Sequence, residues 1–218
     1  MENNKSIFKV VSKSFDYDIN KIQFNLNNLS PEEETCYLIC YALQEAGYKL
    51  PQGMFDSPHL ALLDFLTTNE EVDKFYSITA PLLYKFHSMN KREYPKYSVP
   101  KVLVEAVNLW LKQTVIEFDE NTKPITILNE LLSMRPVLVI DMDHHLSIVN
   151  GFEYELDKSI DLEETADIIY ETNPSRINIL SRKEQSSIDY AFFIKSIKPL
   201  SSATDKWVFT IKKPTAII

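Results

Sequence analysis

Glycine is almost absent from this chain, and its scarcity restricts the folds that the chain can adopt. The 218 residues include only 3 glycines. A usual frequency of roughly 7% would give about 15. Glycine permits positive φ angles and lets the backbone approach phosphate groups closely. Gly47, Gly53 and Gly151 are too far apart for a dinucleotide-binding fingerprint or a P-loop, which argues against a conventional nucleotide-binding α/β fold.

The remaining composition is typical of a globular protein with a substantial core. Hydrophobic residues account for 44% of the chain and aromatic residues for 11%. We therefore expect a single domain over residues 1–218. The net charge is −8 and the pI about 5.1. This balance argues against nucleic acid as a partner, because such binding needs a cationic surface. No apolar run approaches the ~20 residues of a membrane span.

The N-terminal segment and the cysteines indicate the expected compartment. MENNKSIFKVV is polar and lacks the apolar stretch of a secretory signal. Cys36 and Cys40 are four residues apart and do not provide a disulfide framework, which favours a reducing environment. We expect a cytoplasmic protein, with export by a route without a cleavable signal left open. The oligomeric state also stays open.

Helical patterns dominate the first part of the chain, and the clearest one begins at Ser30. Ser30 can cap a helix, Pro31 suits its first turn, and Glu33 completes an S-x-x-E capping box. Apolar residues then recur at helical spacing until Gly47, which can end the helix in a left-handed conformation. A short helix also fits PITILNELLSM. Further helical segments are predicted up to about residue 113, with starts at Pro58, Pro81 and Pro100.

From residue 135 onward the pattern changes to short runs rich in β-forming residues. VLVIDM and HLSIVNGFEY are separated by Asp143 and His144, which predicts a hairpin or two adjacent strands. The run over 182–197 fits either a helix or a strand. Two further strands are predicted over 168–172 and 206–213.

Helices and strands are thus segregated along the chain, which predicts an α+β fold. We expect a mainly helical lobe over residues 30–134 and a mainly β lobe over 135–218. The first 28 residues are predicted to form an extended lead-in.

Three residues, in the order Cys, His, Asn, have the chemistry for nucleophilic catalysis. Cys36 lies just inside the start of its helix, where the positive end of the helix dipole lowers a thiol pKa. His145 begins an apolar strand, which would hold an imidazole near a nucleophile as a general base. On that strand His145, Ser147 and Val149 are expected to share one face. Asn173 ends a strand candidate and could orient the imidazole through a hydrogen bond.

The contexts of these residues resemble the papain-like cysteine peptidases, in particular the peptidase domains of bacteriocin-processing transporters and their free-standing relatives. CYLICYALQEAGY, which begins at Cys36, resembles the nucleophile helix and the residues that close it. LLSMRPVLVI resembles the stretch that leads to the family's histidine. HLSIVNGFE resembles the histidine strand with its terminal glycine, and this alignment selects His145 over His144. IYETNP resembles the element that carries the third catalytic residue.

The resemblance implies hydrolysis or acyl transfer on a peptide or amide bond, by a peptidase, a deamidase or a transferase. Cys36 would be the nucleophile, His145 the general base and then acid, and Asn173 the residue that orients the imidazole. The implied fold has a helical lobe with the cysteine, followed by an antiparallel β lobe with the histidine. The implied partner is a peptide or protein substrate, and no cofactor is expected.

Three features depart from the family pattern. The first is Tyr37, directly after the nucleophile, where relatives commonly have glycine or tryptophan. The family places a glutamine about six residues before the nucleophile, and this chain has Ser30 there, with Asn27 and Asn28 as the nearest carboxamides. Loss of such an oxyanion donor costs about 3 kcal/mol of transition-state stabilisation. If Ser30 caps the helix, Cys36 lies in the second turn, whereas a helix that begins at Thr35 would restore the family geometry.

Two other functions stay open. A papain-like scaffold without activity would be an interaction protein, and a distance above about 6 Å between the Cys36 thiol and the His145 ring nitrogens would favour it. A metal-dependent hydrolase could use Asp141, Asp143 and His145, which would share one face of an extended strand. The remaining histidines, His59 and His87, are expected to be structural or surface residues.

Overall fold

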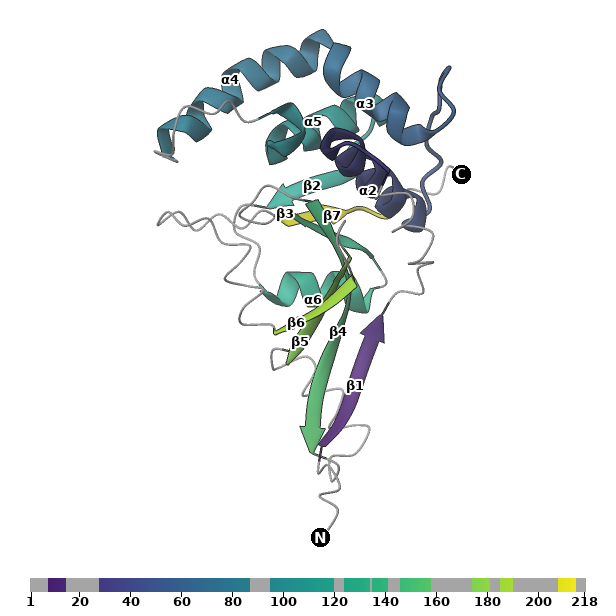
Figure 1. Cartoon of the computed structure of the whole chain (residues 1–218), viewed down its shortest axis with the longest axis vertical. Helices are drawn as coiled ribbons and strands as arrows, with labels where there is room; N and C mark the ends of the chain where they lie inside the picture. The colour runs from purple at the N-terminus through teal and green to yellow at the C-terminus, as the bar shows by residue number, and fades with distance from the viewer. Residues whose placement is uncertain are drawn as a thin grey trace.

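The computed structural model combines helices with an antiparallel sheet, which confirms the predicted α+β class (Figure 1). Helices gather at one end of the molecule, and the paired strands over residues 8–14 and 146–157 extend toward the other. The residues that the structure describes are 8–14, 28–86, 95–119, 124–133, 135–140, 146–157, 174–180, 185–189 and 208–214.

Seven strands form the sheet within the described residues, and every pair of neighbours is antiparallel. The order is β2-β7-β3-β4-β5-β6, and β1 pairs with β4. The strand after His145 therefore lies between β3 and β5, as the predicted pair of adjacent strands requires. The bounds are β1 Phe8–Ser14, β2 Ile116–Asp119, β3 Val137–Ile140, β4 Leu146–Asp157, β5 Arg176–Leu180, β6 Gln185–Asp189 and β7 Val208–Ile211.

Most of the predicted helices are present, and none of the described ones is long and apolar enough to cross a membrane. The predicted capping box at Ser30 is confirmed, because its hydroxyl accepts from Glu33 N at 3.3 Å and the Glu33 carboxylate accepts from Ser30 N at 2.8 Å. Gly47 follows the helix with a φ of 96°, as predicted. The bounds are α2 Pro31–Glu45, α3 Pro58–Thr68, α4 Glu70–Phe86, a 3-10 turn η1 Lys96–Ser98, α5 Pro100–Leu111 and α6 Pro124–Leu132.

The prediction that Pro81 starts a helix is wrong. Pro81 lies inside α4, which is continuous from Glu70 to Phe86. A proline in a helix interior removes one backbone hydrogen bond and costs about 3 kcal/mol. The apolar spacing before and after Pro81 keeps one helical phase, and α4 packs along α5, so tertiary contacts offset the local cost.

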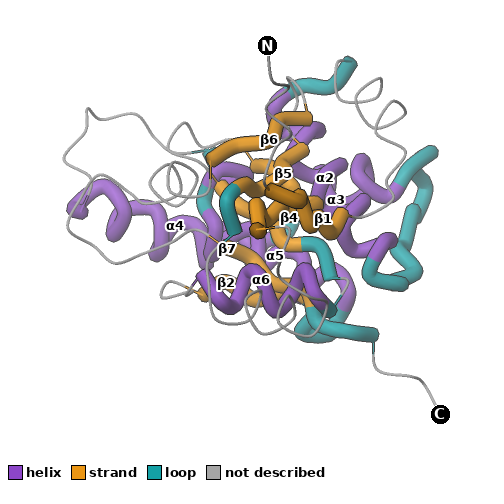
Figure 2. Tube along the Cα trace, turned by 90° about the horizontal axis from the view of Figure 1, so that it is seen from below, coloured by secondary structure: helices purple, strands orange, loops and turns teal. Residues whose placement is uncertain are grey.

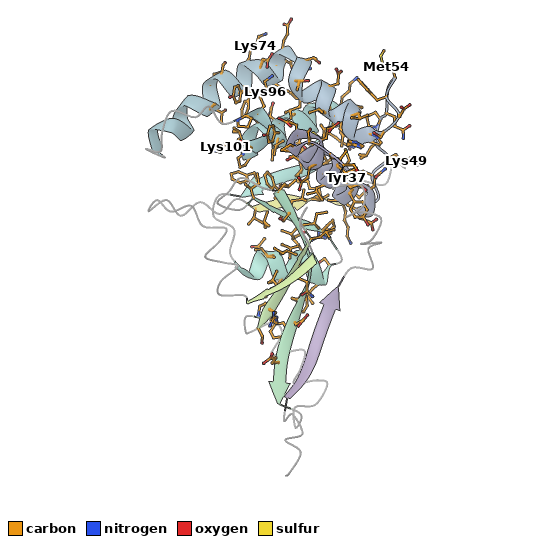
Figure 3. All side chains as sticks on the ribbon, in the orientation of Figure 1. Tyr37, Lys49, Met54, Lys74, Lys96 and Lys101 are labelled. Atoms are coloured by element: carbon orange, nitrogen blue, oxygen red, sulfur yellow. The ribbon has the colours of Figure 1, made fainter. Side chains whose placement is uncertain are left out.

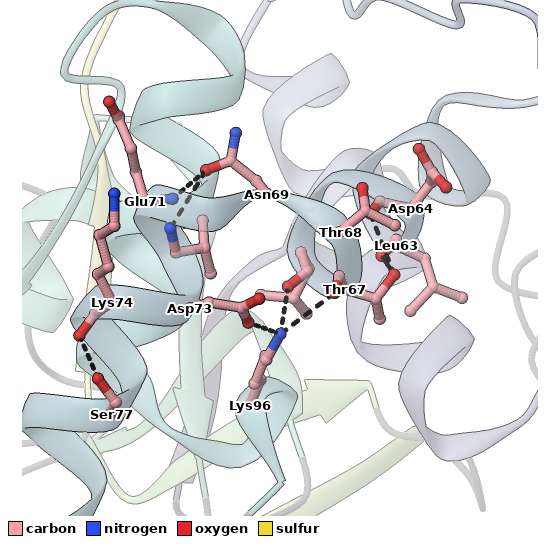
Figure 4. Close-up of polar contacts among 12 residues, drawn as sticks. Leu63, Asp64, Thr67, Thr68, Asn69, Glu71, Asp73, Lys74, Ser77 and Lys96 are labelled. Atoms are coloured by element: carbon pink, nitrogen blue, oxygen red, sulfur yellow. Dashed lines mark hydrogen bonds and ion pairs between the residues drawn. The ribbon is translucent and has the colours of Figure 1, made fainter.

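The Lys96 side chain links the η1 turn to the junction between α3 and α4 (Figure 4). Its ammonium donates to the carbonyl oxygens of Leu66 and Thr67 at 3.4 and 3.2 Å and forms an ion pair with Asp73. A cation at the carbonyl end of a helix interacts favourably with the helix dipole. The Asn69 side chain accepts from the first backbone N–H groups of α4. These polar contacts hold α3 and α4 in their relative positions.

The sheet is covered on both faces, by a different set of helices on each. Figure 2 shows the strands near the middle with helices around them. One face packs on α2 and α5, which in turn pack on α3, and together they form what we call the helical core. Its strand residues are Ile116, Leu138, Ile140, Leu146, Ile148, Leu180, Phe209 and Ile211. The other face packs on α6 to form the α6 core, and its strand residues are Val137, Val139, Val149, Phe152, Tyr154, Ile177 and Val208.

A bulge in β4 changes which residues face each core. Before the bulge Ile148 faces the helical core and Val149 the α6 core. The register against β5 then slips between Val149 and Gly151, so that Phe152 takes the α6 face. The expectation that Gly151 ends the histidine strand is therefore wrong. The strand continues to Asp157, because β1 pairs with it from Gly151 onward.

Several strands depend on pairing that is distant in sequence. The strand predicted over 206–213 is confirmed as β7, and the ambiguous run 182–197 contains β6. The sequence pattern did not predict β2 or β5 as strands, and it indicated only an extended or weakly structured lead-in where β1 lies. β2, which lies in the region expected to be mainly helical, pairs with β7 from the region expected to be mainly β. The strand predicted over 168–172 lies outside the described residues.

Asn108 joins α5 to the edge strand β2. Its side-chain oxygen accepts from Val115 N and Ile116 N at 2.8 and 3.1 Å, and its amide nitrogen donates to Ile116 O at 2.9 Å. The carboxamide thus takes the place of a neighbouring strand for this part of β2.

We expect Asn108→Ala to lower the free energy of unfolding by about 2–4 kcal/mol, because it leaves three partly buried backbone groups without their partners. Urea denaturation followed by circular dichroism measures the change. Asn129→Ala, at an exposed position of α6, is the matched control and should change stability by less than about 0.5 kcal/mol. Equal denaturation midpoints for the two variants would contradict the role of Asn108.

Candidate functional site

Cys36 lies in the second turn of α2 and faces the interior. Helix α2 begins at Pro31, so the alternative start at Thr35 is wrong. The Cys36 side chain is 0% exposed and belongs to the helical core, together with Leu146 at the start of β4. Cys40, one turn later, is also buried, and both thiols are free. The helix that carries both cysteines packs on β3 and β4.

The expected lowering of the Cys36 thiol pKa is wrong. Burial raises the pKa of Cys36 to about 12, and the negative charges of Glu32 and Glu33 add to the rise. The helix dipole acts mainly within the first turn, and Cys36 lies beyond it. Burial among apolar side chains therefore has a larger effect on the Cys36 pKa than the helix dipole, because it disfavours the charged thiolate. Burial also raises the pKa of Cys40, and the neighbouring Cys36 contributes to that rise.

The other two members of the proposed triad, His145 and Asn173, lie outside the described residues. The residues that follow them are described. Leu146 packs in the same core as Cys36, and Pro174 is buried just before β5. The structure thus brings Cys36 and the residue after His145 into one cluster, through the contact of α2 with β3 and β4.

The metal-binding hypothesis rests on residues that the structure does not describe, namely Asp141, Asp143 and His145. In the part of the chain that is described, no group of three or more His, Cys, Asp or Glu side chains could hold a metal ion. His87 also lies outside that part. The position expected for an oxyanion glutamine holds Ser30, whose hydroxyl is used in the helix cap.

A pocket lies on the outer side of α2, where the sequence analysis expected no site. It has a volume of about 340 Å³ and lies between the start of α2, its outer face and the start of α3. Figure 3 shows Tyr37 on α2, at the end of the molecule where the helices gather. We call this hollow the aromatic pocket, and the residues that line it are Asn28, Leu29, Tyr37, Cys40, Tyr41, Gln44, Ser57, Pro58 and His59.

Three rings form the aromatic part of this pocket. The Tyr37 and Tyr41 rings are stacked, with centroids 6.4 Å apart and planes 24° apart. The His59 ring meets Tyr37 edge to face, with centroids 5.4 Å apart and planes 78° apart. Burial lowers the pKa of His59, and the nearby Glu33 carboxylate partly opposes that shift. His59 was expected to be structural or at the surface, and the structure places it in the wall of this pocket.

The sequence does contain a signal for this pocket. Tyr37, Tyr41 and Gln44 follow the spacing of one helix face, next to the face of Cys36 and Leu43. Two large aromatic residues one turn apart on a helix indicate a shared aromatic contact surface. Contact with His59 depends on the packing of α3 against α2, which no local pattern predicts.

Comparison of the chain with models of known protein families, with curated proteins and with solved structures finds no match.

We expect the stability difference between the wild type and Cys36→Ala to shrink at alkaline pH. The folded pKa of about 12 lies above the ordinary value of 9.0. The unfolded thiol therefore ionises first, and the stability contributed by the neutral thiol is full below pH 9 and is lost as the pH rises toward 12. The loss is about 1.4 kcal/mol for each pH unit above 9.

Urea denaturation of both proteins at pH 8 and pH 10.5 measures this change. Leu38→Ala, a fully buried position on the same helix, is the control, because its side chain has no titratable group. Its destabilisation should be equal at the two pH values. A constant difference between the wild type and Cys36→Ala would mean that the thiol ionises normally in the folded protein.

Proposed function

We propose that the chain is a papain-like protein that acts by binding another molecule rather than by thiol catalysis. The observation that carries this proposal is the burial of Cys36, whose side chain is 0% exposed. A nucleophilic thiol must be partly accessible and must ionise near neutral pH. Cys36 lies among apolar side chains, and its pKa is raised to about 12. In this position the thiol fills space in the core.

The order and packing of the elements support the papain-like scaffold. A helix with the cysteine comes first, and it packs on an antiparallel sheet. The strand that follows His145 is β4, and its neighbour β5 follows the pair Asn173 and Pro174. The family resemblance implies the same order: a helix with the cysteine, then a strand next to the histidine, then a strand next to the asparagine.

The faces of β4 support binding over catalysis. Leu146 and Ile148 face the helical core, which contains Cys36, whereas Val149 faces the α6 core. The sequence analysis expects His145 on the face of Val149. The predicted face of His145 is thus the face of Val149, not the face of Leu146 and Ile148, which pack with Cys36.

One observation favours the second candidate, cysteine-dependent hydrolysis or acyl transfer on a peptide or amide bond. Leu146 lies in the same cluster as Cys36, so the backbone next to His145 starts close to the helix of the nucleophile. In that reaction the Cys36 thiolate would attack the carbonyl carbon and form a thioester. The amine would leave with a proton from His145, and water or another acceptor would then cleave the thioester. Asn173 would orient the imidazole.

Alkylation by iodoacetamide distinguishes the two functions. In the binding protein we expect Cys36 to react at least about 100-fold more slowly than glutathione at pH 7.5, because three pKa units reduce the thiolate fraction about 1,000-fold. The measurement uses Cys40→Ala, so that Cys36 is the only thiol, and mass spectrometry follows its modification. In urea the same thiol should react at the rate of the model thiol.

Fast alkylation of Cys36 would contradict the binding function. If Cys36 reacts as fast as glutathione and His145→Ala slows the reaction, the protein is a thiol enzyme and the binding-only proposal fails. A separate variant, Cys36→Ala, retains Cys40, so it measures the labelling of that thiol alone. Its circular dichroism spectrum verifies that the removal of the thiol leaves the fold intact.

A further inference from the structure

The aromatic pocket presents two stacked tyrosine rings of α2, which are partly buried and pack against the edge of the helical core. The Tyr37 and Tyr41 centroids are 6.4 Å apart, and both side chains are partly exposed. The face of an aromatic ring carries negative charge and attracts cations that lie within about 6 Å of its centre. Two such ring faces on one helix form a binding surface for a flat or extended cationic group.

The charges near the pocket favour a cation. The Glu33 carboxylate lies close enough to His59 to influence its pKa, and the Ser30 cap lowers the pKa of Glu33, so Glu33 is ionised at pH 7. His59 is neutral there, since burial lowers its pKa. The described residues that line the pocket include no lysine or arginine. Three first-turn carboxylates also offset the positive end of the α2 dipole: Glu32, Glu33 and Glu34.

The remaining lining suits a long side chain that ends in N–H groups. Leu29 and Pro58 provide apolar surface for an alkyl stem, as lysine and arginine stems require. Asn28, Gln44 and Ser57 carry oxygen atoms that can accept hydrogen bonds. The volume of about 340 Å³ exceeds what an ammonium group alone would fill, and it fits a whole side chain.

We propose that the aromatic pocket binds a cationic side chain, arginine or lysine, of a partner peptide. The cation would lie against Tyr37 and Tyr41 and near the Glu33 carboxylate, with its stem along Leu29 and Pro58. This inference rests on the proposed function, because it names the ligand class of the binding protein. It assigns the binding to the face of α2 that carries Tyr37 and Tyr41, whereas Cys36 lies in the helical core. Cys40, which is 3% exposed, borders both the helical core and the pocket.

Calorimetric titration of the full chain with acetylated and amidated peptides Ala-X-Ala tests the ligand class, with X as arginine, lysine, citrulline or leucine. Citrulline keeps the shape and hydrogen-bonding groups of arginine without its charge. We expect the arginine or lysine peptide to bind about 10-fold more tightly than the citrulline peptide. If neither the arginine nor the lysine peptide bound more tightly than the citrulline peptide, the proposal would be overturned.

Two pairs of variants locate the binding. Tyr41→Leu should weaken the preferred cationic peptide at least about 5-fold, while Tyr41→Phe, which keeps a ring, should bind as the wild type does. Glu33→Gln removes the charge but also disturbs the helix cap. Ser30→Ala disturbs the same cap and keeps the charge, so it is the matched control. We expect only Glu33→Gln to weaken binding, about 3- to 10-fold. Equal weakening by Ser30→Ala and Glu33→Gln would overturn the role of the charge.

The failure of this inference is distinguishable from failure of the proposed function. Fast alkylation of Cys36 would overturn the binding-only function, and it would leave the difference between the arginine and citrulline peptides as measured. Loss of that difference would overturn the pocket assignment, and it would leave the alkylation rate of Cys36 unchanged. Thermal melting of each variant separates a loss of binding from a loss of fold.

Discussion

The structure depends on one short strand that is buried on both of its faces. β3 has four residues, and each is at most 3% exposed. Leu138 and Ile140 pack toward the helical core, while Val137 and Val139 pack toward the α6 core. β7 and β4 flank β3 in the sheet. The two cores therefore meet at β3, and the helices on each face are positioned relative to the same four residues. The position of α2, and with it the burial of Cys36, follows from this arrangement.

Helix α2 carries buried thiols on one face and partly exposed tyrosine rings on another. Its inner face places Cys36 among apolar side chains, and Cys40 lies between that core and the aromatic pocket. Burial keeps both thiols protonated at neutral pH. Its outer face places Tyr37 and Tyr41 beside the aromatic pocket. The same helix thus provides packing on one side and a polar, accessible surface on the other.

The elements predicted correctly from the sequence are those encoded by local signals. The Ser30 capping box and the glycine after α2 lie within one or two turns of the residues that they control, so the helix boundaries follow from them. The α+β class follows from the segregation of helical and strand patterns. β2 and β5 lack strong patterns of their own and are strands because of long-range pairing with β7 and β4.

The candidate site likewise combines features that local sequence signals predict with features that depend on tertiary packing. The position of Cys36 on a capped helix was predictable, whereas its enclosure by Leu146 and other core residues depends on tertiary packing. The dipole argument for a low thiol pKa is local, and burial acts against it with a larger effect. The contact between Tyr37 and His59 likewise joins two helices. Sequence reasoning identified residues with chemistry, and the fold decides which of them are accessible.

The bulge in β4 makes one continuous strand behave as two segments with opposite phase. Residues up to Val149 follow one alternation, and residues from Phe152 follow the other. The first segment belongs to the interface with the cysteine helix, and the second pairs with β1 and packs on α6. A change in length on one side of the bulge therefore need not exchange the inward and outward residues on the other. The two ends of β4 are free to diverge separately, although the backbone between them is unbroken.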